Sequence, residues 1–99
     1  MAYRIEYSPD AEQHLRALTA RQQAIVLDRV DLHLAHEPAV ETRNRKPMRP
    51  NPIAPWELRI GALRVYYDIS EQPEQTVVIL AVGVKAHNRV SIGKEVVNL

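Results

Sequence analysis

The sequence predicts an α+β fold with the element order β-α-α-β-β-β, in which a small, twisted, mainly antiparallel sheet packs against an N-terminal helical hairpin. Three observations predict it. Two helix-start signals lie near the N-terminus, two short alternating segments flank a Gly-Ala pair in the middle, and a nearly continuous apolar segment follows later. At 99 residues we expect one domain, residues 1–99, because a chain of this size can bury enough surface for a single core.

The composition excludes several classes of protein. The chain has no cysteine, so neither disulfides nor thiolate metal sites are expected. No apolar segment approaches the roughly 18 residues that a membrane-spanning helix needs. The N-terminal residues alternate instead of forming a basic and then apolar leader, so we expect a cytoplasmic protein. Residues 37–64 hold six basic and three acidic residues, so the excess positive charge lies in the middle of the chain.

The first elements are a strand and a helix. Alternation over residues 3–7 predicts a half-buried strand. Ser8 is a suitable N-cap and Pro9 suits the first helical position, so a helix should begin there. Its core face should carry three residues at helical spacing, namely Ala11, Leu15 and Leu18.

A second helix should follow almost at once. Thr19 and Gln22 have the spacing of a capping box, which predicts a helical hairpin with a very short loop. We expect Leu27, Val30 and Leu34 on its buried stripe. The helix should end near Glu37, because Pro38 disfavours helical geometry at the residue before it.

Residues 38–55 contain five prolines and no clear periodicity, which predicts a long irregular loop. Four basic residues lie within seven positions: Arg43, Arg45, Lys46 and Arg49. Held on a stiff backbone, they could bind a polyanion such as nucleic acid. The alternative is a solvated connector that the prolines only make rigid.

Residues 56–60 and 63–69 form the hairpin around which the other elements are arranged. Gly61-Ala62 fits a type II′ turn, since only glycine readily takes the positive φ of its first position. The resulting register pairs Arg59 with Arg64 and Glu57 with Tyr66, all on one polar face. Paired arginines repel, and a phosphate would relieve the repulsion. The alternative is that Glu57 and Asp68 neutralise them.

The segment from Thr76 to Val84 is almost entirely apolar and predicts a strand buried on both faces. A basic segment follows it, containing Lys85, His87 and Arg89, and residues 91–99 read as a short tail.

Residues 57–69 and 78–85 together resemble the RelE/ParE toxin superfamily of type II toxin–antitoxin, or plasmid-stabilisation, modules. The resemblance implies a RelE-like fold and a cognate antitoxin that wraps and blocks the toxin. It implies one of two targets: messenger RNA in the ribosomal A site, which is cut, or DNA gyrase, which is poisoned. Arg64 matches the arginine that holds the scissile phosphate in RelE-like nucleases, and Lys85 matches the basic residue after the last strand's glycine. Pro55 and Glu57 stand where RelE has lysines, and Ser91 where it has a tyrosine.

Cleavage of RNA without a metal needs a base, an acid and cations. His87 suits the acid or base role because imidazole titrates near neutral pH. Glu57 is the alternative base, with Arg59, Arg64 and Lys85 as charge stabilisers. Tyr66 could stack on a base. The full set of expected nucleic-acid-binding residues is Arg43, Arg45, Lys46, Arg49, Arg59, Tyr66 and Arg89.

No cofactor is expected. The remaining histidines, His14, His33 and His36, have no partner at ligand spacing, so no metal site is expected. Three functions stay open: a ribosome-dependent endoribonuclease that inhibits translation, a non-catalytic gyrase inhibitor, and an inactive antitoxin-binding or RNA-binding member.

Overall fold

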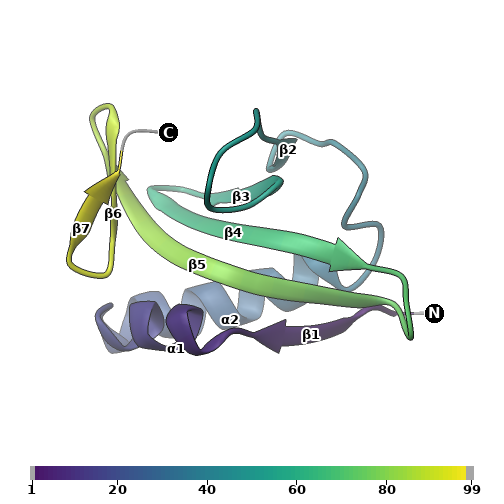
Figure 1. Ribbon diagram of the computed structural model, residues 1–99. Coiled ribbons are helices and arrows are strands. Elements are labelled where there is room, and N and C mark those ends of the chain that lie inside the picture. Colours follow the sequence, from purple (N-terminus) through teal and green to yellow (C-terminus); the bar gives the residue numbers. More distant parts are fainter. Residues whose placement is uncertain (1, 98–99) are drawn as a thin grey trace.

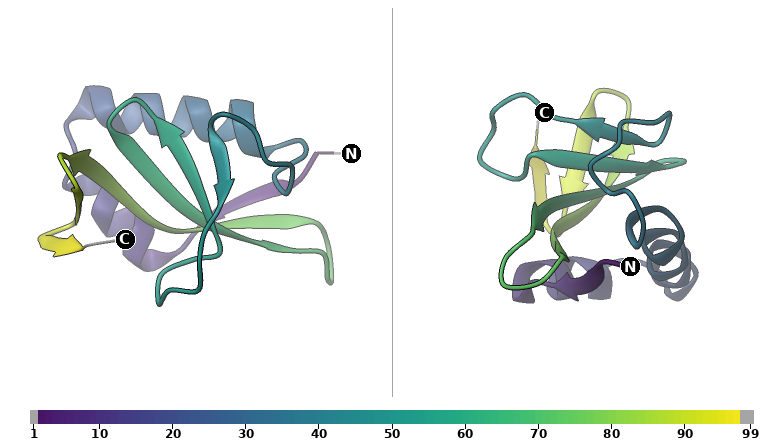
Figure 2. Two further views of the ribbon diagram at one scale, coloured as in Figure 1. Left: turned by 90° about the horizontal axis from the view of Figure 1, so that it is seen from above. Right: turned by 90° about the vertical axis from the view of Figure 1, so that its right-hand side faces the viewer.

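The computed structural model describes residues 2–97. The elements in chain order are β1 Arg4–Tyr7, α1 Pro9–Arg16, α2 Ala20–Leu34, β2 Arg45–Pro47, β3 Trp56–Ile60, β4 Leu63–Ser70, β5 Thr76–Ala86, β6 Arg89–Ile92 and β7 Glu95–Val97. The strands form one sheet in the order β2-β3-β4-β5-β6-β7, antiparallel throughout, and β1 adds to β5 in parallel. Both helices lie on the same side of this curved sheet (Figures 1 and 2). The predicted α+β class and helical hairpin are confirmed.

Both helices begin where their caps predict. The Ser8 side chain accepts a hydrogen bond from the Ala11 backbone N–H, and Thr19 forms a reciprocal capping box with Gln22. The stripe expected on α2 was wrong by one position: Val26 is buried together with Val30 and Leu34, while Leu27 is 45% exposed. Both sets have helical spacing, so the choice depends on how the short loop at residues 17–19 aims α2 at the sheet.

The central hairpin has the predicted register. Glu57 pairs with Tyr66 and Arg59 pairs with Arg64. Of the two turn residues, only Gly61 has a positive φ, 57°, as a type II′ turn requires.

Three short strands were not predicted. β2 lies within the segment expected to be irregular, and pairs with β3 through residues 45–47. β7 and the second half of β6 lie within residues 91–99, which were expected to form a tail, and β6 begins at Arg89, in the expected basic segment. Each is only three or four residues long, too short for a period-two pattern to identify, and each forms because a longer neighbouring strand offers unpaired backbone groups.

A bulge in β5 changes which of its side chains point to each face of the sheet. Tyr66 pairs with Ala81 but Tyr67 pairs with Ile79, which leaves Leu80 as an extra residue. Ile79 and Val82 therefore both belong to the main core under the helices, whereas Ala81 joins a smaller cluster on the opposite face with Tyr66. A bulge increases local twist, and β5 is visibly bent along its length (Figure 1).

Candidate functional site

The face of the sheet turned away from the helices carries the predicted polar residues in cross-strand rows. One row runs from Lys46 through Glu57 to Tyr66. The next places Arg59 beside Arg64, which in turn faces Gly83. Because β2, β3, β4 and β5 are adjacent, residues far apart in the chain share this face.

A cavity of about 550 Å³ opens on this face between the loop of residues 48–52 and the β5–β6 hairpin. Four of its lining residues are basic: Lys46, Arg49, Arg59 and Lys85. Its one acidic lining residue is Glu57. We call it the cationic cavity. Four positive charges around one carboxylate leave an excess that favours a bound anion.

Glu57 is the most buried charged group of this site, at 8% exposure. Its Oε1 atom accepts a hydrogen bond from Arg59 Nε at 2.7 Å. A buried carboxylate is costly unless it is paired and hydrogen-bonded. Arg59 supplies one such contact, so the two side chains act as a unit on β3.

Arg64 lies next to the cationic cavity but does not line it. Its Nη1 atom donates to the carbonyl oxygens of Gly61 at 2.6 Å and of Leu63 at 2.9 Å. The guanidinium therefore folds back over the β3–β4 turn. Its role as a phosphate-holding residue stays a prediction.

Two expected nucleic-acid contacts are contradicted. Tyr66 is completely buried, so the expectation that it stacks on a base is wrong. Arg45 donates to the carbonyl oxygen of His33 in the last turn of α2 at 2.6 Å and to that of Val40 in the following loop at 2.9 Å, so it binds the C-terminal end of α2 and the adjoining loop instead of facing nucleic acid. The alternation of β2 explains this: Lys46 faces Glu57, and Arg45 faces the helices.

The other predicted residues do not line the cavity. Arg43, Arg89 and His87 are exposed, and none of the three lines it. His87 has a φ of 58° as the first residue of the two-residue β5–β6 turn, and its neighbour Asn88 does reach the cavity wall. These assignments stay predictions.

Sequence reasoning missed Asn51, which organises the loop. Its side-chain oxygen accepts from the backbone N–H groups of Ile53 and Ala54, and its amide donates to the Arg49 and Ala54 carbonyls. An asparagine between two prolines is a turn signal, and it could have shown that this loop is ordered.

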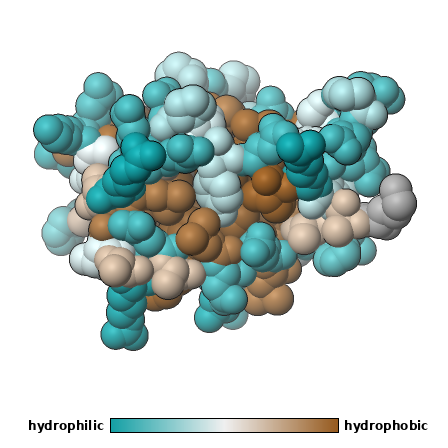
Figure 3. Space-filling view, turned by 90° about the horizontal axis from the view of Figure 1, so that it is seen from below, coloured by the Kyte–Doolittle hydropathy of each residue, from teal (hydrophilic) through white to brown (hydrophobic). Residues whose placement is uncertain are grey.

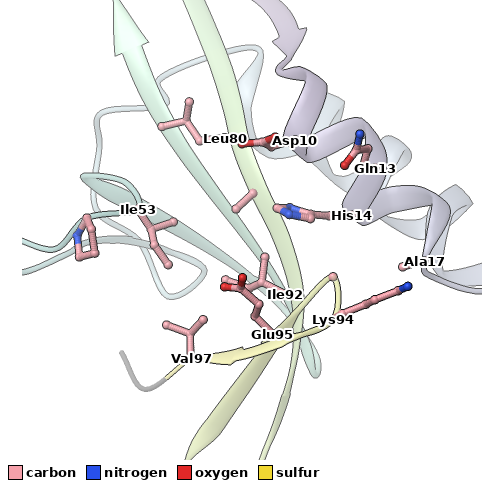
Figure 4. Close-up of a pocket in the computed structure, with 13 residues that line it drawn as sticks. Asp10, Gln13, His14, Ala17, Ile53, Leu80, Ile92, Lys94, Glu95 and Val97 are labelled. Carbon is pink, nitrogen blue, oxygen red and sulfur yellow. The ribbon is translucent and has the colours of Figure 1, made fainter.

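A second cavity, of about 650 Å³, lies between α1 and the β6–β7 hairpin (Figure 4). Asp10, Gln13 and His14 line it from α1. We call it the α1 cavity. Four of its larger apolar lining residues come from the loop before β3 and from β5, β6 and β7, namely Ile53, Leu80, Ile92 and Val97. Pro52 and Val97 line both cavities, so the two adjoin.

A third cavity, of about 420 Å³, is lined by the loop of residues 48–55 together with Asp68 and Leu80. The helix-bearing face mixes apolar and hydrophilic side chains (Figure 3). On α2, Leu27 and Leu32 are exposed. Within residues 2–97 no group of three or more histidine, aspartate or glutamate side chains could hold a metal ion. None of the helices in this range is long and apolar enough to cross a membrane.

The helical hairpin on a curved antiparallel sheet agrees with the RelE-like fold that the resemblance implied. The family model for the ParE toxin of the type II toxin–antitoxin system parDE matches residues 5–89. The chain belongs to this family and is a toxin of a type II toxin–antitoxin system.

A solved toxin–antitoxin complex contains a chain that is similar in sequence and fold. A chain of the toxin–antitoxin complex RelBE2 from Mycobacterium tuberculosis is 30% identical, with a TM-score of 0.74. The match covers 88% of this protein and 95% of that chain. A search of curated proteins finds no match.

Proposed function

We propose that this toxin inhibits translation by cutting messenger RNA on the ribosome, and that the cationic cavity is its site. One observation carries the proposal: Lys46, Arg49, Arg59 and Lys85 converge from four segments of the chain around the buried carboxylate of Glu57. Basic side chains attract the phosphate backbone, and a nearby carboxylate can accept a proton. A ribosomal target places the toxin in the cytoplasm.

The proposed reaction needs no metal. Glu57 takes the proton of a ribose 2′-hydroxyl, and the 2′-oxygen attacks the adjacent phosphorus atom. The bond from phosphorus to the 5′-oxygen breaks, leaving a 2′,3′-cyclic phosphate, and an acid returns a proton to the leaving oxygen. His87, one residue from the cavity wall, is the candidate acid. Lys85, Arg59 and Arg64 stabilise the charge that develops on the phosphate.

The test is cleavage of a translated message on programmed ribosomes by the purified wild-type toxin, with the ends mapped by primer extension. We expect cuts within ribosome-bound codons, unchanged by EDTA. The nuclease proposal would be wrong if the purified toxin cut no message. Gyrase-linked DNA breaks in cells that express the toxin would then identify it as a gyrase inhibitor.

Gyrase inhibition is the second candidate function, and two observations favour it. The matching family is that of the ParE toxins. Poisoning of DNA gyrase is one of the two activities that the resemblance to the RelE/ParE superfamily implies. In addition, the Glu57 carboxylate is already paired with Arg59, so the base would have to exchange this partner before it could act.

We also propose that a cognate antitoxin binds across the α1 cavity and the adjoining cationic cavity. The apolar floor at Ile53, Leu80 and Ile92 suits the apolar side chains of a bound segment (Figure 4). Because the two cavities adjoin at Pro52 and Val97, carboxylates further along that segment could enter the cationic cavity.

An acidic substitution in the α1 cavity tests the antitoxin proposal. Ile53→Glu should lower the affinity for the co-expressed antitoxin by at least about 100-fold, because it buries a charge against apolar side chains. Leu32→Glu on the exposed outer side of α2 is the matched control. Equal affinities of both variants, measured by calorimetry, would exclude the α1 cavity as the docking site.

A further inference from the structure

The hydroxyl group of Tyr66 is an anomaly in this fold. Tyr66 is completely buried, and among the described residues its hydroxyl is the only buried side-chain polar atom without a hydrogen-bond partner. Buried polar groups are almost always hydrogen-bonded, so each exception needs an explanation. A phenylalanine would fill the same volume at no such cost, so the hydroxyl itself requires a reason.

The neighbour of this hydroxyl is Glu57. The two residues are directly opposite each other on β3 and β4, and their side chains point to the same face of the sheet. Arg59 contacts only the Oε1 atom of Glu57. The Oε2 atom therefore remains available to a second donor, and a buried carboxylate is stabilised when both oxygens are satisfied.

The electrostatic surroundings make Tyr66 a donor. Burial raises the pKa of Tyr66, and the adjacent Glu57 carboxylate raises it further, outweighing the opposing influence of Arg64 and Arg59. The phenol therefore keeps its proton at any pH at which the protein works. A neutral O–H group beside a carboxylate can only donate to it.

We infer that Tyr66 is the positioning residue for Glu57: its hydroxyl donates to the carboxylate oxygen that Arg59 leaves free, and so aims Glu57 into the cationic cavity. Held from both sides, the carboxylate would keep one orientation when Arg59 turns to a bound phosphate. The catalytic part of this inference rests on the proposed nuclease function, but the pairing does not.

A double-mutant cycle tests the pairing without any activity assay. Tyr66→Phe, Glu57→Gln and the double variant are compared with wild type by urea unfolding. A hydrogen bond to a charged group should appear as a coupling of about 10- to 100-fold in the unfolding equilibrium constant. Tyr67→Phe is the matched control, because its hydroxyl donates to the Pro38 carbonyl at 2.8 Å on the helix side. Tyr67→Phe should not couple to Glu57→Gln.

A coupling below about twofold would overturn the inference, since it would show that the hydroxyl and the carboxylate do not interact. A second measurement needs no variant of Tyr66. The ¹³Cζ resonance of Tyr66 should move when Glu57→Gln is introduced, while that of Tyr67 should stay in place. An unmoved Tyr66 resonance would also overturn the inference.

The catalytic consequence has its own readout. If the wild-type toxin cleaves message, Tyr66→Phe should lower the single-turnover rate by about 10-fold, leave ribosome affinity unchanged, and move the acidic limb of the pH–rate profile. A rate and profile identical to wild type would remove Tyr66 from the reaction. If the wild type does not cleave, the nuclease proposal fails, and the double-mutant cycle alone decides the pairing.

Discussion

Lys85→Ala is expected to slow cleavage of ribosome-bound message by about 10²- to 10³-fold, the range seen when one group that stabilises transition-state charge is removed. Lys85 lines the cationic cavity with Glu57 and Arg59. It is exposed and makes no ion pair among residues 2–97. Its loss should therefore change stability by under about 0.5 kcal/mol, as is usual for surface residues. Single-turnover cleavage and thermal unfolding measure the two effects.

Lys94→Ala is the matched control, because it removes the same charge from the β6–β7 turn, at the α1 cavity. It should cleave at the wild-type rate. Equal rates for both lysine variants would show that the cationic cavity is not where the reaction occurs. Equally slow cleavage by both would instead point to the net charge of the protein, acting through long-range attraction to the ribosome.

Gly83→Ala is expected to destabilise the protein by about 2 kcal/mol or more, which corresponds to a fall in Tm of roughly 8–16 °C for a domain of this size. A Cβ atom at this position would lie 2.7 Å from the Ser91 carbonyl oxygen, 2.8 Å from Val90 Cγ1 and 2.9 Å from Ile92 Cγ1. The oxygen belongs to the backbone of β6, so relief requires the two strands to separate. Differential scanning calorimetry of wild type and variant measures the change.

Gly61→Ala is the comparison variant, because it introduces backbone strain without crowding. Gly61 has a φ of 57°, but no atom lies within 4 Å of a Cβ placed there. The variant should therefore cost only the left-handed conformation of a non-glycine residue, about 1–2 kcal/mol. If Gly83→Ala retained the wild-type Tm, the close approach of β6 to β5 would not be a constraint on this fold.

Gly83 also connects stability to the site. It lies on the site face beside Arg64, and its lack of a side chain lets β6 approach and place Val90 in the wall of the cationic cavity. A variant that separates β5 from β6 should therefore also widen the site.

Features that depend on residues close together in the chain could be predicted from the sequence. Ser8 and Thr19 mark the helix starts because a cap bonds to backbone groups three residues away. Gly61 fixes the turn, and the turn fixes the register, so that Arg59 was correctly placed opposite Arg64. The resemblance of the two C-terminal motifs identified the toxin superfamily to which the chain belongs.

Which of the polar residues face the site depends on how distant segments of the chain pack together. Arg45 and Lys46 are adjacent in a basic segment, yet strand pairing turns one toward the end of α2 and the other toward Glu57. Tyr66 lies on the predicted face, but residues from the loop at 48–54 and from β6 cover it. These outcomes depend on contacts between segments distant in sequence, and no local pattern records which distant segment will cover a given side chain.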